Sequence, residues 1–167
     1  FGKEPARCLH EMLALCEKLG FPTENMDDRV GWCEYGEGEE MVAVLGHLDV
    51  VPAGDGWTES EPFSGEIKNG RIYGRGTMDD KGPMVAAVYA LAALKQSGFQ
   101  PSRRIRVIFG TNEETGCGDM AWYASHGGEM PVMGFTPDGE YPLINGEKGI
   151  LNGTYTRTLH QTGDYIL

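Results

Sequence analysis

The sequence has few basic side chains for its length. Its 167 residues include 14 lysines and arginines against 25 aspartates and glutamates, which gives a formal net charge of −11. Such an excess of negative charge disfavours nucleic acids and anionic membranes as partners, because both carry charge of the same sign. The composition instead predicts a soluble protein that attracts cations.

Long apolar runs and paired cysteines are also missing. The longest apolar stretch, around residues 84–94, is interrupted by small residues and is too short to span a bilayer. The four cysteines form no Cys-x-x-Cys pair, which indicates neither a structural zinc knot nor a disulfide framework. This pattern favours a reducing, cytoplasmic location. Cys117 follows Glu114 by three residues and could lie near a site, but a small buried side chain is the favoured interpretation.

The first residues lack the features of a secretion signal. Residues 1–4 are not a basic segment that leads into an apolar one, so no signal peptide is expected. Phenylalanine stands in the place of an initiator methionine, which predicts that the chain begins inside a longer gene product. The length suits one domain that buries about two-thirds of its unfolded surface.

Apolar patterns of helical and strand type alternate along the chain. Helical spacing and helix-stop residues predict helices over residues 4–19, 83–95 and 118–125. Short segments rich in β-branched and aromatic residues predict strands over residues 30–35, 41–45, 103–109 and 132–135. This order is typical of an α/β domain.

Two hairpins are expected from turn residues. The strands at 30–35 and 41–45 are separated by Gly36-Glu37-Gly38, which favours a hairpin between them. Asn69-Gly70 lies between alternating residues in the segment 66–73, and this pair is the strongest local hairpin signal in the sequence.

Acidic and imidazole side chains follow successive predicted strands or hairpins. In chain order they are His47 with Asp49, Asp79 with Asp80, Glu113 with Glu114, and Asp138. Open α/β sheets bind ligands in the crevice beyond the carboxyl ends of their strands, so these side chains are expected to meet there. The pattern predicts a two-metal hydrolase.

The spacing within the clusters indicates different roles. His47 and Asp49 project to the same side if the strand continues, so Asp49 can orient the imidazole and fix the tautomer presented to a metal. Asp79 can bridge two cations through its two carboxylate oxygens. Glu113 and Glu114 point in different directions at a strand end, so one can bind metal while the other transfers protons.

Each cluster taken alone has a simpler interpretation. A single His-x-Asp pair often belongs to an ordinary surface or core histidine, and Glu113-Glu114 alone would suit an exposed acidic loop. Asp80 suits a solvated turn in which it favours the positive end of the following helix. The presence of all the clusters in one chain favours the metal site.

Four motifs together carry a family resemblance. They occupy residues 46–52, 74–83, 112–116 and 136–139. In combination they resemble the zinc-dependent aminoacylase and carboxypeptidase family of metallopeptidases, and in particular its PepV-type dipeptidases, over residues 1–150. The resemblance implies a three-layer α/β catalytic domain with a mixed sheet between helices.

The resemblance also implies the roles of the site residues. One metal ion is expected on His47, Asp79 and Asp138, and a second on Asp79, Glu114 and His160. Glu113 is expected to be the general base and acid, with Asp49 beside it, and a cis peptide is expected between Asp79 and Asp80. The implied cofactors are two Zn²⁺ ions, although carboxylate-rich sites also accept Mn²⁺ or Co²⁺.

The implied substrate is a dipeptide with a free amino terminus, because Asp138 resembles the dipeptidase members, whereas deacylase members more often have glutamate there. Deacylation of N-acyl amino acids at the same site is the alternative. His160 lies in a segment that resembles the carboxyl-terminal family motif but occurs early, because the family has a lid domain between the positions of residues 150 and 151.

The domain division follows from that gap. Residues 1–150 are expected to form the N-terminal part of the catalytic domain, and residues 151–167 its C-terminal segments, with the lid absent. A lidless fragment that binds metal with little turnover is a further alternative. The sequence leaves the oligomeric state and the dipeptide preference open.

Overall fold

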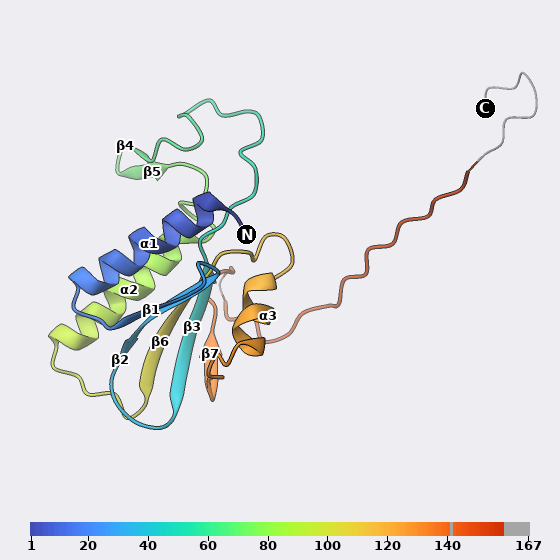
Figure 1. Ribbon diagram of the computed structural model, residues 1–167. Coiled ribbons are helices and arrows are strands. Elements are labelled where there is room, and N and C mark those ends of the chain that lie inside the picture. Colours follow the sequence, from blue (N-terminus) through green and yellow to red (C-terminus); the bar gives the residue numbers. More distant parts are fainter. Residues whose placement is uncertain (141, 159–167) are drawn as a thin grey trace, which may run out of the picture.

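The computed structural model describes residues 1–140 and 142–158 (Figure 1). Its helices are α1 (Lys3–Lys18), α2 (Lys81–Gln96) and α3 (Gly118–Ser125). Its strands are β1 (Thr23–Met26), β2 (Val30–Tyr35), β3 (Met41–His47), β4 (Glu66–Lys68), β5 (Arg71–Tyr73), β6 (Arg104–Gly110) and β7 (Met133–Phe135). Every helix and strand expected from the sequence is present with bounds that differ by at most two residues.

Five strands form a mixed sheet in the order β1-β2-β6-β3-β7. β6 pairs antiparallel with β2 and parallel with β3, and β7 pairs parallel with β3. The expected hairpin between β2 and β3 is therefore wrong, because β6 lies between them. β6 is buried over its last five residues, so a central position removes more of its apolar surface from water than an edge position would.

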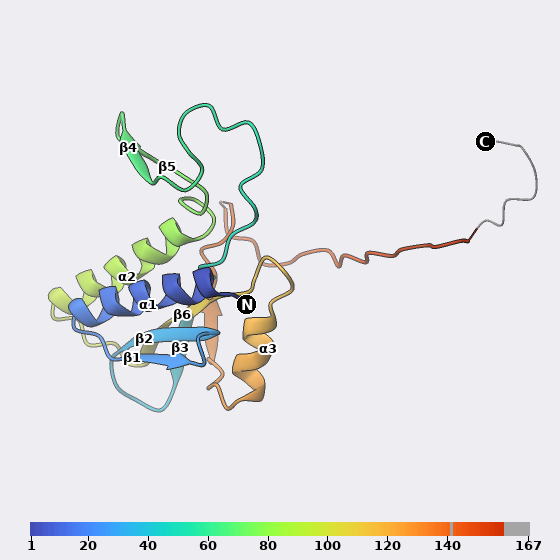
Figure 2. The same cartoon turned by 45° about the horizontal axis from the view of Figure 1, so that its top comes forward.

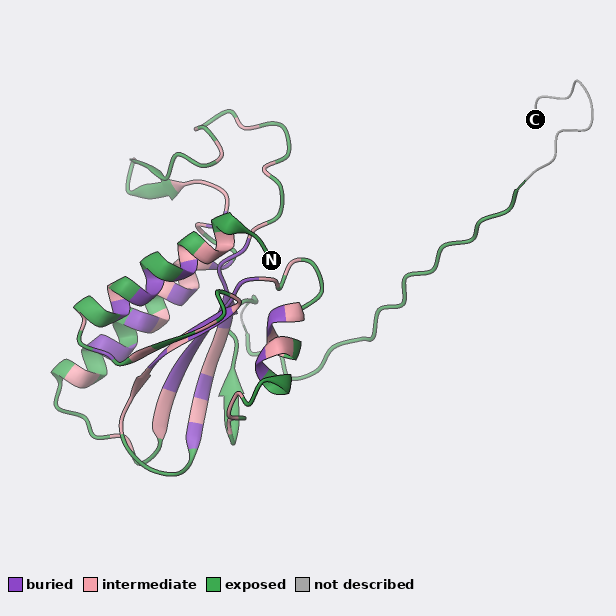
Figure 3. Ribbon diagram, in the orientation of Figure 1, coloured by how far each residue is buried: buried purple, intermediate pink, exposed green. Residues whose placement is uncertain are grey.

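Helices cover both faces of the sheet, as Figure 2 shows. α1 and α2 pack on one face around Leu9, Met84 and Phe109, whereas α3 packs on the other face near Ile108 and Tyr123. Purple segments in Figure 3 mark these buried residues between the layers. The expected three-layer α/β fold with a mixed sheet is confirmed. None of the helices in the described part of the chain is long and apolar enough to cross a membrane.

The hairpin of β4 and β5 stands apart from the main sheet (Figure 1). Its two turn residues, Asn69 and Gly70, have φ angles of 53° and 73°. These left-handed values are those that a tight two-residue hairpin turn needs, and asparagine and glycine tolerate them best. The hairpin expected from the Asn-Gly pair is confirmed.

β1 is a strand that the sequence patterns did not indicate. Its residues Thr-Glu-Asn-Met show no apolar alternation, and both central side chains are exposed. The strand exists because it pairs antiparallel with β2 at the edge of the sheet. Pairing with a neighbouring strand, which is a tertiary contact, thus decides its conformation.

β3 passes very close to the start of α2 at Gly46. A methyl group on Gly46 would overlap the Asp80 carboxylate and the Met84 thioether, and both side chains are fully buried. We expect Gly46→Ala to lower the free energy of unfolding by about 1–3 kcal/mol, the usual cost of overpacking a core.

Urea unfolding followed by circular dichroism measures this change. Gly149→Ala is the matched control, because no atom lies within 4 Å of a methyl group added there. An unchanged unfolding midpoint for Gly46→Ala would contradict the close packing of β3 against α2.

Candidate metal centre

The site lies where three parallel strands end. β6, β3 and β7 run in the same direction, so the residues that follow them meet at one edge of the sheet. His47 is the last residue of β3 and lies opposite Gly110, the last residue of β6. The loop after β6 carries Glu113 and Glu114, and the turn after β7 carries Asp138.

One nitrogen of His47 faces several carboxylates. Its Nε2 atom lies 3.0 Å from Asp79 Oδ1, 3.4 Å from Asp138 Oδ2 and 3.9 Å from Glu113 Oε2. The imidazole is almost completely buried, whereas the side chains of Asp79 and Glu113 are 64% and 45% exposed. The site is therefore an open cluster of acids around one buried imidazole.

Two groups of potential metal donors share this histidine. The donor atoms of His47, Asp79 and Glu114 lie within 4.8 Å of one another, and so do those of His47, Asp80 and Asp138. The two groups come from residues that are far apart in the sequence. Folding thus brings the described members of both expected ligand sets near one histidine, but Asp80 stands in the group with Asp138, where Asp79 was expected.

Asp49 holds two parts of the site together. The His47 Nδ1–H donates to the backbone carbonyl of Asp49 at 2.9 Å, and the Asp49 carboxylate lies 3.5 Å from the same nitrogen. This carboxylate also accepts the backbone N–H groups of Glu113 and Glu114, at 3.1 and 3.2 Å. A proton fixed on Nδ1 leaves Nε2 as the ring nitrogen that faces the acids.

Asp80 has a closer relation to His47 than its sequence pattern indicates. The interpretation as a solvated turn is wrong, because Asp80 is fully buried and its Oδ2 atom accepts the backbone N–H of His47 at 3.2 Å. Its other oxygen, Oδ1, is buried without a hydrogen-bond partner among the described residues. The peptide bond between Asp79 and Asp80 is cis, as the family resemblance implied. An Asp-Asp pair before a helix gives no sequence signal for which of the two turns inward.

The crowded acids change proton affinities in the metal-free site. Burial lowers the pKa of His47, but hydrogen bonds to Asp49 and the charge of Asp138 outweigh it and raise this pKa to about 10. Burial raises the pKa of Glu113, and the nearby acids raise it further against the opposing charge of His47. Burial also raises the pKa of Asp80 to about 6. The negative charges of the cluster thus favour a bound cation or proton. In the metal-free site, His47 carries this proton at neutral pH.

This donor set fits a divalent metal ion. Imidazole nitrogen and carboxylate oxygen are ligands for Zn²⁺, and they also suit Mn²⁺ and Co²⁺. The unpartnered Oδ1 of Asp80 is a second sign, because buried carboxylate oxygens are normally satisfied. His47, Asp79, Asp80, Glu114 and Asp138 are the described residues whose donor atoms could hold such ions.

Cys117 lies on the rim of the site. The expectation that it is a small buried side chain is wrong, because it is exposed. It occupies the left-handed turn before α3, with φ of 51°, which places it outside the core. Its Sγ atom lies 3.9 Å from the Glu113 carboxylate, so the thiol borders the exposed carboxylate of the site.

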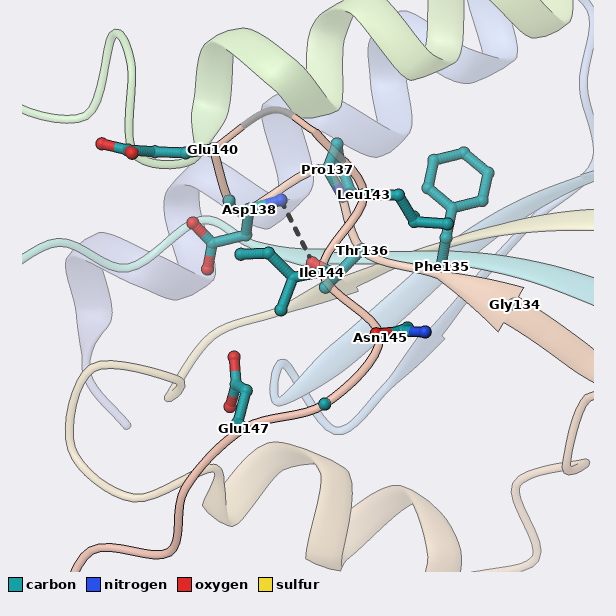
Figure 4. Close-up of a pocket in the computed structure, with 12 residues that line it drawn as sticks. Gly134, Phe135, Thr136, Pro137, Asp138, Glu140, Leu143, Ile144, Asn145 and Glu147 are labelled. Carbon is teal, nitrogen blue, oxygen red and sulfur yellow. Dashed lines mark hydrogen bonds between the residues drawn. The ribbon is translucent and has the colours of Figure 1, made fainter.

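A cavity of about 690 Å³ adjoins Asp138 (Figure 4). It is lined by residues between Gly134 and Glu147, so a single segment forms its walls. Leu143 and Ile144 supply apolar surface, and the Asp138 N–H donates to the Thr136 hydroxyl at 3.2 Å. Its volume lies within the range of small-molecule pockets.

Six of the seven site residues expected from the sequence lie in this cluster. They are His47, Asp49, Asp79, Glu113, Glu114 and Asp138. The seventh, His160, lies outside the described residues.

Comparison with known protein families and curated proteins places the chain among peptidases. The model of "Peptidase family M20/M25/M40" matches residues 43–159. The putative dipeptidase YtjP of Bacillus subtilis (strain 168) is 51% identical over 92% of this chain and 33% of its own length. The Beta-Ala-Xaa dipeptidase of Lactobacillus delbrueckii subsp. lactis is 44% identical over 99% of this chain and 35% of its own length. The chain thus spans about a third of the curated relatives it matches.

Solved structures share the fold. Human carnosine dipeptidase 1 has a TM-score of 0.66 and 23% identity, over 83% of this chain and 33% of its own. The di-peptidase Dug1p from Saccharomyces cerevisiae has a TM-score of 0.52 and 28% identity, over 69% of this chain and 28% of its own. The family expected from the four sequence motifs is confirmed: the chain belongs to the peptidase family M20/M25/M40.

Proposed function

We propose that this chain carries the metal centre of a dipeptidase that hydrolyses dipeptides with a free amino terminus. The observation that supports this most directly is His47 Nε2, which faces the carboxylates of Asp79, Asp138 and Glu113 at 3.0–3.9 Å. The relatives named as dipeptidases support the substrate class.

The proposed site would hold two Zn²⁺ ions, with Mn²⁺ or Co²⁺ as alternatives. His47, Asp79 and Asp138 would hold the first, and Asp79, Glu114 and His160 would hold the second. Asp79 suits the shared position because its Oδ1 atom is the carboxylate oxygen nearest to His47 Nε2, at 3.0 Å. When bound, such ions lower the pKa of a water molecule and polarise the scissile carbonyl.

Glu113 is the proposed general base and acid. Its carboxylate is farther from His47 Nε2 than those of Asp79 and Asp138, and it is exposed enough to meet solvent and substrate. It takes a proton from the attacking water and gives it to the leaving amine. Asp49 positions the Glu113 backbone through the hydrogen bond to its N–H.

We further propose the domain division expected from the sequence. Residues 1–150 form the N-terminal part of the catalytic domain and residues 151–167 its C-terminal segments, with a lid absent between residues 150 and 151. The described residues 151–158 are exposed throughout. A cytoplasmic location is proposed because the described cysteines are free thiols.

A comparison of two substrates tests the proposed function. We expect the zinc-loaded chain to hydrolyse Ala-Ala with a kcat/KM at least about 10-fold higher than for N-acetyl-Ala-Ala, equivalent to about 1.4 kcal/mol in transition-state binding. A chelator removes this activity, and Zn²⁺ restores it.

The other two outcomes contradict the proposal in different ways. Preference for the acetylated compound would indicate a deacylase. Bound zinc without turnover of either compound would indicate a metal-binding fragment that needs further residues for catalysis.

A further inference from the structure

β7, which leads to Asp138, has little side-chain burial of its own. It has three residues, and Met133 and Phe135 are 60% and 59% exposed. Among the described residues it pairs only with β3, in the register Val42↔Met133 to Val44↔Phe135. Short strands without a buried face specify their register weakly.

A register error in β7 would displace Asp138. Asp138 follows the end of β7 by three residues, and its carboxylate lies 3.4 Å from His47 Nε2. A shift of one residue along a strand moves each side chain by about 3.3 Å and turns it to the other face of the sheet. The place of Asp138 therefore depends on what holds β7 in register.

The segment just before β7 is anchored by charges. The Glu129 carboxylate accepts hydrogen bonds from Arg104 Nη1 at 3.0 Å and from Arg106 Nη2 at 3.2 Å, and Arg104 Nη2 donates to its other oxygen. One carboxylate thus joins two guanidinium groups of β6. The hydrogen bonds from Arg104 hold the pKa of Glu129 below its ordinary value, so Glu129 is charged at neutral pH.

The two arginines are themselves fixed. Arg106 is buried, donates to Glu34 Oε2 and to the Tyr123 hydroxyl at 2.8 Å each, and lies over the Trp32 ring. Arg104 donates to the backbone carbonyls of residues 38 and 39 at 2.7 and 3.0 Å. Both guanidinium groups therefore have several partners besides Glu129.

Two further hydrogen bonds hold the segment between Glu129 and β7. The Tyr123 hydroxyl donates to the Glu129 backbone carbonyl at 2.6 Å, so both ends of this residue are held. The Val132 N–H donates to the Met41 carbonyl at 2.9 Å, where β7 joins β3. Glu129 thus lies four residues before the start of β7.

We propose that Glu129 is a positioning residue for the metal centre: its bonds to Arg104 and Arg106 set the register of β7 on β3 and thereby place Asp138 beside His47. This inference rests on the proposed function, because it assigns Asp138 as a metal ligand. Glu129 itself touches none of the described residues of the site, and it acts from the end of the sheet where β6 begins.

Glu129→Gln tests the proposal, because it removes the charge and keeps the size of the side chain. We expect faster hydrogen exchange at the amides of residues 133–138 in the metal-free chain. We also expect Zn²⁺ affinity in calorimetry to fall by about 10-fold, because Asp138 then lies beside His47 in only a fraction of the molecules.

Glu40→Gln is the matched control. Glu40 pairs with Arg103 at 2.6 Å in the same region of the sheet, but this pair is exposed and does not involve the segment before β7. The control is expected to match the parent chain in both measurements.

Two results would overturn the positioning role. One is unchanged exchange at residues 133–138 in Glu129→Gln, and the other is faster exchange there with unchanged zinc affinity. If the parent chain binds no zinc, the proposed function fails, and the exchange rates alone then decide whether Glu129 holds β7.

Discussion

The Glu113→Gln variant is expected to lose dipeptide hydrolysis by about 10²–10⁴-fold, the usual contribution of a general base and acid, and to bind zinc as tightly as the parent chain. Glutamine keeps the size of the side chain but cannot accept and return the proton. Metal binding is expected to persist because Glu113 is the most distant of the three acids that face His47 Nε2.

Two measurements on the same preparation check this result. Initial rates with Ala-Ala give kcat/KM, and calorimetry with Zn²⁺ gives affinity and stoichiometry. Glu66→Gln, on the exposed hairpin strand β4, is the control for a lost surface charge. Retained turnover would remove Glu113 from catalysis, whereas a loss of zinc would make it a ligand instead.

The Asp79→Asn variant is expected to lose both metal affinity and turnover. Asp79 lies nearest to His47 Nε2 and belongs to the donor group with Glu114. Loss of an outer partner of a metal ligand already costs about 10–100-fold in affinity, so loss of Asp79, which we propose as a direct and shared ligand, is expected to cost at least about 100-fold.

The free energy of unfolding distinguishes a loss of metal affinity in Asp79→Asn from misfolding. The Asp79 side chain is 64% exposed, and exposed substitutions usually change the free energy of unfolding by less than about 0.5 kcal/mol. Urea unfolding of the metal-free variant is therefore expected to match the parent. Asp55→Asn, in an exposed loop, is the control, and near-parental zinc affinity in Asp79→Asn would contradict the shared position.

Local elements of this fold could be predicted from the sequence because their signals are local. The spacing of Leu9, Met12, Leu13 and Cys16 predicts one buried face, and α1 buries these four side chains. The pair Asn69-Gly70 predicts a tight turn because both residues tolerate positive φ, and the hairpin forms there.

The candidate site could be predicted in part for a related reason. Clusters that follow parallel strands meet at one edge of a sheet, so the sequence pattern alone predicts that His47, Glu114 and Asp138 lie together. The fold brings them together, while their roles as ligands stay predictions. The family could be predicted because each motif places one of these residues within a characteristic short sequence, such as residues 46–52 around His47.

Tertiary structure alone decided the order of the strands and the burial of individual acids. β6 separates β2 from β3 because it buries more surface at the centre of the sheet than at an edge. The turn sequence at residues 36–38 does not indicate whether β3 or β6 pairs with β2. Asp79 and Asp80 are adjacent and chemically identical, yet the first is mostly exposed and the second is fully buried against His47.

The hydrogen bonds of Glu129 could not be predicted from the sequence either. Nothing near Glu129 in the sequence indicates that Arg104 and Arg106 will bind it, because these residues meet only when the segment before β7 folds back on β6. The sequence by itself determined the helices, the hairpin of β4 and β5, and the chemistry that gathers at the ends of the strands, since periodicity and motif spacing act over short stretches. The tertiary structure decided strand order, burial and register, because these depend on which distant segments compete for the same buried surface.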